Sequence, residues 1–144
     1  MKKNVTGAKK IDTLNLMRPT PFNPITDFAP IPFSEAVCKE ALNLKEAGLA
    51  WTPHVGCFVW DRENRIETAS PFPLDIYFIL NLNRFLEIFE NEEELQGSLV
   101  WVPTASQALT LLNRTRPVEY RFPVMAPEEL LIELYRRLLD HLRD

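Results

Sequence analysis

Apolar residues at helical spacing mark the last part of the chain. Leu131, Leu134, Leu138 and Leu142 follow one another by three or four residues, which places them on one face of a helix. Pro127 suits a first helical position. We therefore expect a helix over residues 127–143, with an apolar face broad enough to bury within the subunit or to pack on a second copy of the chain.

Capping residues indicate three more helices. Ser34 precedes a helical pattern over 35–47 that ends at Gly48, and this pattern puts Cys38 on the buried stripe. Thr104 with Gln107 forms a capping box before a helix over 105–114. A similar box at residue 91 predicts one or two turns that stop at residue 97.

The middle of the chain alternates between strand and helix signals. Residues 55–60 and 65–69 flank a turn-rich segment at 61–64, which predicts a β-hairpin over 55–69. Residues 75–90 favour a helix, although the continuous apolar run at 74–80 is equally compatible with a buried strand. Short strands are expected at 99–102 and, as a further possibility, at 118–122.

Prolines set the first 33 residues apart. Five of the twelve prolines fall there, so we expect no regular secondary structure. Residues 1 to about 15 should be mobile. The rest should form an extended strap, packing in cis or in trans, whose apolar side chains lie on the body: Phe22, Ile25, Phe28, Ile31 and Phe33.

These elements predict an α+β fold. Residues 34–144 should form one domain, in which a small antiparallel sheet led by the hairpin is covered on one face by about four helices. A length of 144 residues with 46% hydrophobic residues suits a single core. The first 33 residues precede that domain as a Pro-rich N-terminal extension.

The composition limits which cellular compartment and which partners we expect. No apolar run is long enough to cross a bilayer, no secretory signal is evident, and two cysteines are few for a disulfide framework. We therefore expect a cytoplasmic protein with no membrane contact. Residues 1–33 carry five basic side chains against two acidic ones, but the rest of the chain is acidic, which disfavours nucleic-acid binding.

Candidate chemistry centres on His54 and Cys57, which could act as base and nucleophile. In an extended strand, however, residues three apart point to opposite faces, so we expect the two side chains to be separated. Cys57 then becomes a small core residue. No metal-ligand spacing or glycine-rich loop is present, and neither a metal nor a cofactor is expected.

Aromatic and arginine side chains near the hairpin offer a surface for a ligand or partner. Such residues are enriched at interface centres, and the candidates here are Trp60, Arg62, Arg65 and Phe72. With no catalytic constellation evident, the favoured hypothesis is a small bacterial-type, non-enzymatic interaction or regulatory module. It would self-associate through the leucines of 127–143. The alternative is a small hydrolase or transferase that uses His54 and Cys57.

Overall fold

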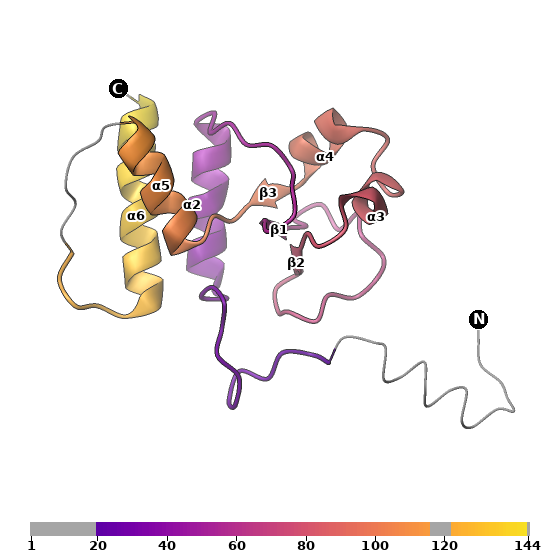
Figure 1. Ribbon diagram of the computed structural model, residues 1–144, viewed down its shortest axis with the longest axis horizontal. Coiled ribbons are helices and arrows are strands. Elements are labelled where there is room, and N and C mark those ends of the chain that lie inside the picture. Colours follow the sequence, from indigo (N-terminus) through magenta and orange to yellow (C-terminus); the bar gives the residue numbers. More distant parts are fainter. Residues whose placement is uncertain (1–19, 116–121, 144) are drawn as a thin grey trace, which may run out of the picture.

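The fold is α+β, as the sequence predicts. The computed structural model describes residues 20–115 and 122–143 (Figure 1). Its elements, in chain order, are α2 (Glu35–Glu46), β1 (Phe58–Trp60), β2 (Ile76–Phe78), α3 (Leu82–Leu86), α4 (Glu92–Ser98), β3 (Val100–Trp101), α5 (Ala105–Thr115) and α6 (Pro127–Arg143). The expectations for residues 1–19 and for a strand at 118–122 fall wholly or mainly outside the described residues.

The sheet is antiparallel, with strand order β2-β1-β3. Val59 of β1 lies opposite Tyr77 of β2 and Trp101 of β3. The return strand of the hairpin is therefore Ile76–Phe78, and the prediction of 65–69 is wrong. The cause is Asp61, whose carboxylate accepts hydrogen bonds from the backbone N–H groups of Arg65 (2.9 Å) and Ile66 (2.8 Å). These two donors are therefore used within the turn and do not pair with β1.

The predicted helix over 75–90 is also corrected. Its first part is β2, and the helical pattern becomes a helix only after Asn81, whose side chain accepts from the backbone N–H of Asn83 at the start of α3. The strand alternative for the apolar run is the right one. α3 covers only five residues.

The sheet separates two apolar cores. Successive side chains of a strand point to opposite faces, so Phe58 joins the core around α2, α5 and α6, and Val59 joins the core around α3 and α4. We call these core one and core two. Helices therefore lie on both sides of the sheet (Figure 1), whereas the sequence predicted cover on one face.

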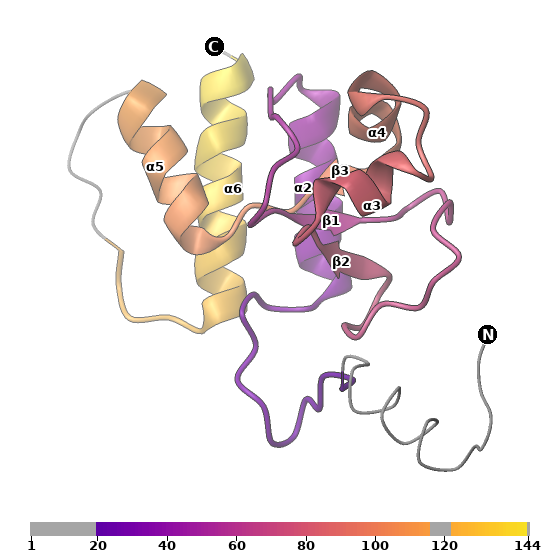
Figure 2. The ribbon, with the colours of Figure 1, turned by 45° about the vertical axis from the view of Figure 1, so that its right-hand side comes forward.

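The helices of core one pack side by side, as Figure 2 shows. The Tyr135 hydroxyl of α6 is fully buried there and donates to the carbonyl of Pro103. Leu131, Leu134 and Leu138 are buried within the same chain, and only Leu142 is partly exposed, at 37%. Of the two alternatives predicted for this face, burial within the subunit therefore accounts for these three leucines.

Helix ends follow the predicted caps. Ser34 Oγ accepts from the N–H of Val37 (3.1 Å), and Gly48 ends the turn after α2 with a φ of +93°. Thr104 and Gln107 exchange the two hydrogen bonds of a capping box, at 3.1 and 2.9 Å.

The described part of the N-terminal segment packs on its own chain. The N–H of Phe22 donates to the carbonyl of Pro71 (2.7 Å), and Ile31 is buried in core one. Ile25 and Phe28 were expected on the body, yet they are 90% and 99% exposed. Both residues lie in a turn that places their side chains outward. In this turn the N–H of Asn23 donates to the Asp27 carboxylate (2.9 Å), and the N–H of Asp27 donates to the Asn23 carbonyl (2.9 Å). Among the described residues, no helix has the length and apolar character needed to span a membrane.

Candidate functional site

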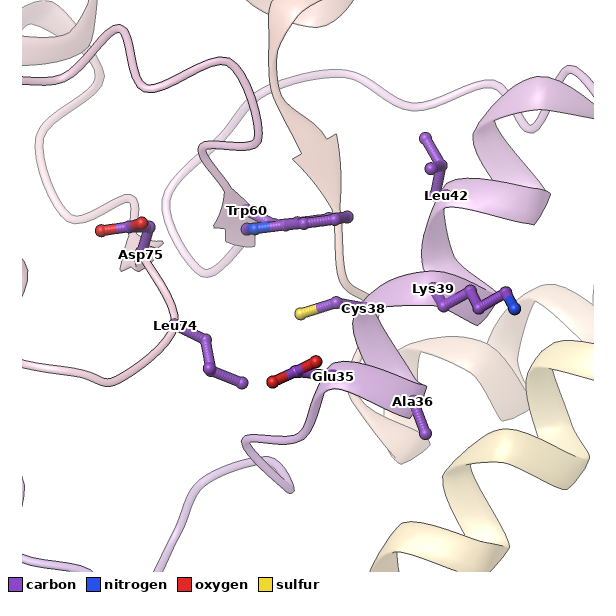
Figure 3. A pocket seen from close by; sticks show the side chains of 8 residues that line it. All are labelled: Glu35, Ala36, Cys38, Lys39, Leu42, Trp60, Leu74 and Asp75. Carbon is purple, nitrogen blue, oxygen red and sulfur yellow. The ribbon is translucent and has the colours of Figure 1, made fainter.

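A hollow of about 490 Å³ opens between α2 and the sheet, and we call it the Trp60 hollow. One wall comes from α2, and the other comes from the end of β1 and the turn before β2. Figure 3 shows the Trp60 indole, the Cys38 sulfur and the Leu74 side chain converging on it. Its lining is mainly apolar, which suits an apolar group more than a polar substrate.

The α2 wall is fixed by the start of the helix. Ser34 caps the first turn, and the following residues present Glu35 and Cys38 to the hollow. Burial, and to a lesser extent the charge of Glu35, raises the pKa of the Cys38 thiol to about 11. At neutral pH this thiol is protonated and serves as an apolar surface rather than a nucleophile.

The opposite wall is a strained turn. Leu74 and Asp75 have φ values of +62° and +57°, and the N–H of Ile76 returns to the carbonyl of Pro73 (3.3 Å). Two successive left-handed residues without glycine cost about 1 to 3 kcal/mol each. The turn is held by the N–H of Asp61, which donates to the Asp75 carbonyl (3.0 Å), and by the Ser70 hydroxyl, which donates to the Ile76 carbonyl.

Charges surround the mouth of the Trp60 hollow. The Glu35 carboxylate points inward beside Leu74, and Asp75 lies at the far side with its carboxylate turned outward (Figure 3). The Lys39 amine points away from the centre. The mouth is therefore bordered by two carboxylates and favours a cationic neighbour beside an apolar group.

The four predicted partner-binding residues are spread over the surface. Trp60 lines the hollow and Arg62 is exposed, whereas Arg65 pairs with Glu94 (2.5 Å) and lies over the ring of Phe89 (4.9 Å). Phe72 stacks on the ring of Phe33 with centroids 5.1 Å apart. Sequence reasoning missed Glu35, Cys38 and Leu74 as lining residues, because no local pattern joins α2 to a turn 40 residues later.

His54 and Cys57 are closer than the sequence predicted. The Cys57 sulfur lies 3.4 Å from Nδ1 and 3.7 Å from Nε2 of His54, because residues 55–56 form a turn with Gly56 at a φ of +110° and β1 begins only at Phe58. The expectation that they point to opposite sides is wrong.

The contact nevertheless lacks the geometry of an activated thiol. Nδ1 also lies 2.6 Å from the Thr52 carbonyl, so this nitrogen carries the proton and donates it there. The sulfur is almost equidistant from both ring nitrogens and lies on the lone-pair line of neither. Cys57 is fully buried, and burial raises its pKa.

Metal-ligating side chains do not gather in the described part of the chain: no group of three or more His, Cys, Asp or Glu residues there could hold an ion. Comparisons with family models, curated proteins and solved structures found no match for this chain.

Proposed function

We propose that this protein is a small, non-enzymatic interaction module of the cytoplasm that holds a partner polypeptide at the Trp60 hollow. The observation that carries the proposal is the hollow itself, an open space of about 490 Å³ beside a half-buried tryptophan. Tryptophan is enriched among the few residues that carry most of the binding energy at protein interfaces. The strained backbone at Leu74 and Asp75 supports the interpretation of this hollow as a binding site, because such strain concentrates at functional sites.

The partner is defined by the chemistry of the hollow. Its walls accept an aliphatic or aromatic side chain, and the carboxylates of Glu35 and Asp75 favour a lysine or arginine next to that side chain. The occupant is thus a peptide segment in which an apolar residue and a basic residue are neighbours.

A display library of random twelve-residue peptides tests this proposal. The full chain should select sequences with an apolar residue beside Lys or Arg. Glu35→Trp, which fills the mouth, should weaken the selected peptides at least about tenfold, a change of 1.4 kcal/mol. Glu46→Trp makes the same substitution at an exposed site at the other end of α2 and should leave binding unchanged. Equal binding by both variants, or no selected sequence, would refute the module.

A thiol enzyme is the second candidate, favoured by the 3.4 Å contact between Cys57 and His54. An active thiolate would react with iodoacetamide within minutes at pH 7, and the adduct would map to Cys57. We expect instead that native protein stays unmodified over hours and that alkylation follows only on unfolding in urea. Rapid labelling of native Cys57 would favour the enzyme.

A further inference from the structure

The Trp60 indole presents a flat face to the hollow. Figure 3 shows the indole edge-on, and the side chains of Glu35, Cys38 and Leu74 all lie on the same side of its plane. One aromatic face is therefore a wall of the hollow, and a carboxylate lies on the side to which it is turned. The volume of about 490 Å³ falls within the range of about 300 to 1,000 Å³ that small-ligand pockets have.

The two carboxylates of this hollow are not paired with a cation of the described chain. Three other glutamates form the ion pairs among residues 20–115 and 122–143, and neither Glu35 nor Asp75 takes part in one. Lys39 belongs to the same lining, but its amine points away from the centre (Figure 3). Glu35 and Asp75 are both exposed, so their charge is available to an incoming cation.

We propose that the Trp60 hollow is a guanidinium site, in which the basic residue of the bound peptide is an arginine that enters the hollow. Its planar guanidinium stacks on the indole face and donates two N–H groups to the Glu35 carboxylate, while its aliphatic stem lies against Cys38 and Leu74. The apolar neighbour of the arginine covers the rest of the lining. This inference rests on the proposed function and names the side chain that the same site recognises.

The shape of the site favours arginine over lysine. Both side chains carry one positive charge, so long-range attraction to the carboxylates does not distinguish them. A guanidinium is flat, weakly hydrated and able to donate two parallel N–H groups, whereas an ammonium is a compact and strongly hydrated point charge. Glu35 is exposed in the first turn of α2, so its side chain can turn both oxygens toward the edge of a stacked guanidinium.

Three peptides that differ in one side chain test the guanidinium. The sequence Gly-Leu-X-Gly, blocked at both ends, carries arginine, lysine or citrulline at X, and citrulline is a neutral side chain of nearly the same shape as arginine. Binding to the full chain is followed by NMR through the indole N–H signal that Trp60→Leu removes. The arginine peptide should bind about tenfold tighter than each of the others. Equal binding of the arginine and lysine peptides, or no binding of the arginine peptide at millimolar concentration, would overturn the proposal.

A matched pair of variants isolates the carboxylate. Glu35→Gln keeps the size of the side chain and removes its charge, so the arginine peptide should bind about tenfold more weakly and its advantage over lysine should fall to about threefold or less. Glu46→Gln makes the same change at an exposed site at the other end of α2 and should leave both affinities unchanged. Undiminished arginine binding by Glu35→Gln would contradict the site.

Peptide-bound and free guanidinium groups share this chemistry, and a blocked single arginine separates them. It should bind at least about threefold more weakly than the arginine peptide, because it lacks the apolar neighbour. If it binds as tightly, the guanidinium site stands, and its ligand is a small guanidinium compound in place of the partner polypeptide. If library-selected peptides are lost with Glu35→Trp but accept lysine and arginine equally, the module stands and the guanidinium site is wrong.

Discussion

Cys38 is a residue whose burial gives folding a pH dependence. Its pKa is about 11 in the folded chain against an ordinary value of 9.0, so the folded state favours the protonated thiol. The resulting stabilisation is complete below about pH 9 and disappears as pH rises toward 11. A difference of two units corresponds to about 2 to 3 kcal/mol.

Urea unfolding of the natural chain and of Cys38→Ala checks this dependence. The natural chain should be more stable at pH 7.5, and its advantage should shrink steadily up to about pH 10.5. Cys57, whose pKa burial also raises, is present in both proteins, so its effect cancels in the difference. Tyr135 does not cancel fully, because the charge of Cys38 contributes to its raised pKa, and this coupling adds to the loss at high pH in the natural chain. A constant advantage over this range would contradict the role of the thiol.

Asp61 is the residue that bends the chain away from a simple hairpin. It is 2% exposed and accepts backbone N–H groups from Arg65 and Ile66. Asp61→Ala leaves both donors without this acceptor, and we expect a loss of about 3 kcal/mol in the free energy of unfolding. Asp61→Asn keeps one acceptor oxygen and should lose less. Equal stability of all three proteins would show that water replaces the carboxylate.

At the scale of elements, the sequence predicted helices better than strands. α2 has the Ser34 cap, and α6 has Pro127 at its first position and a long apolar period, so their bounds were expected almost to the residue. The strands have only two or three residues, too few for alternation to appear. The apolar run before α3 became β2 because pairing with β1 decided between two local possibilities.

Lys45 joins two helices in a way that no local pattern reveals. Its ammonium group on α2 donates to the carbonyls of Gln96 (2.8 Å), Gly97 (2.8 Å) and Leu99 (2.9 Å) at the end of α4. Burial lowers its pKa, but the three bonds satisfy carbonyls that α4 leaves open.

Lys45→Met should therefore loosen α4 more than it affects α2. We expect a loss of about 2 kcal/mol in the free energy of unfolding and faster amide hydrogen exchange over residues 92–99. Lys39→Met, an exposed position on the same helix, should change both measurements little. Unchanged exchange in α4 with Lys45→Met would mean that packing alone holds that helix.

At the scale of the whole molecule, the candidate site could be predicted only in part. Trp60 was singled out from its type and its place at the end of a strand. Its neighbours in the hollow were not, since Cys38 and Leu74 come together only through the packing of α2 against the sheet. Leu74 in a left-handed turn contradicts local preference, and strained residues of this kind are the ones that local rules miss.

The sheet should make the two cores unfold as one unit. β1 gives Phe58 to core one and Val59 to core two, so neither core can lose its packing without disturbing the same strand. Near-ultraviolet circular dichroism includes the stacked Trp51 and Trp101 rings of core two together with Trp60 and Tyr135 of core one, and far-ultraviolet signal reports mainly the long helices of core one. The two urea curves should coincide.

Truncation in either core tests this coupling. Leu134→Ala in core one and Leu95→Ala in core two each remove a fully buried side chain, and each should cost about 2 to 5 kcal/mol. Both signals should shift to the same lower midpoint in each variant, because the shared strand transmits the loss across the sheet. If Leu95→Ala shifts only the aromatic signal, then α3, α4 and their core unfold as a separate unit, and the wall of the Trp60 hollow on α2 would survive their loss.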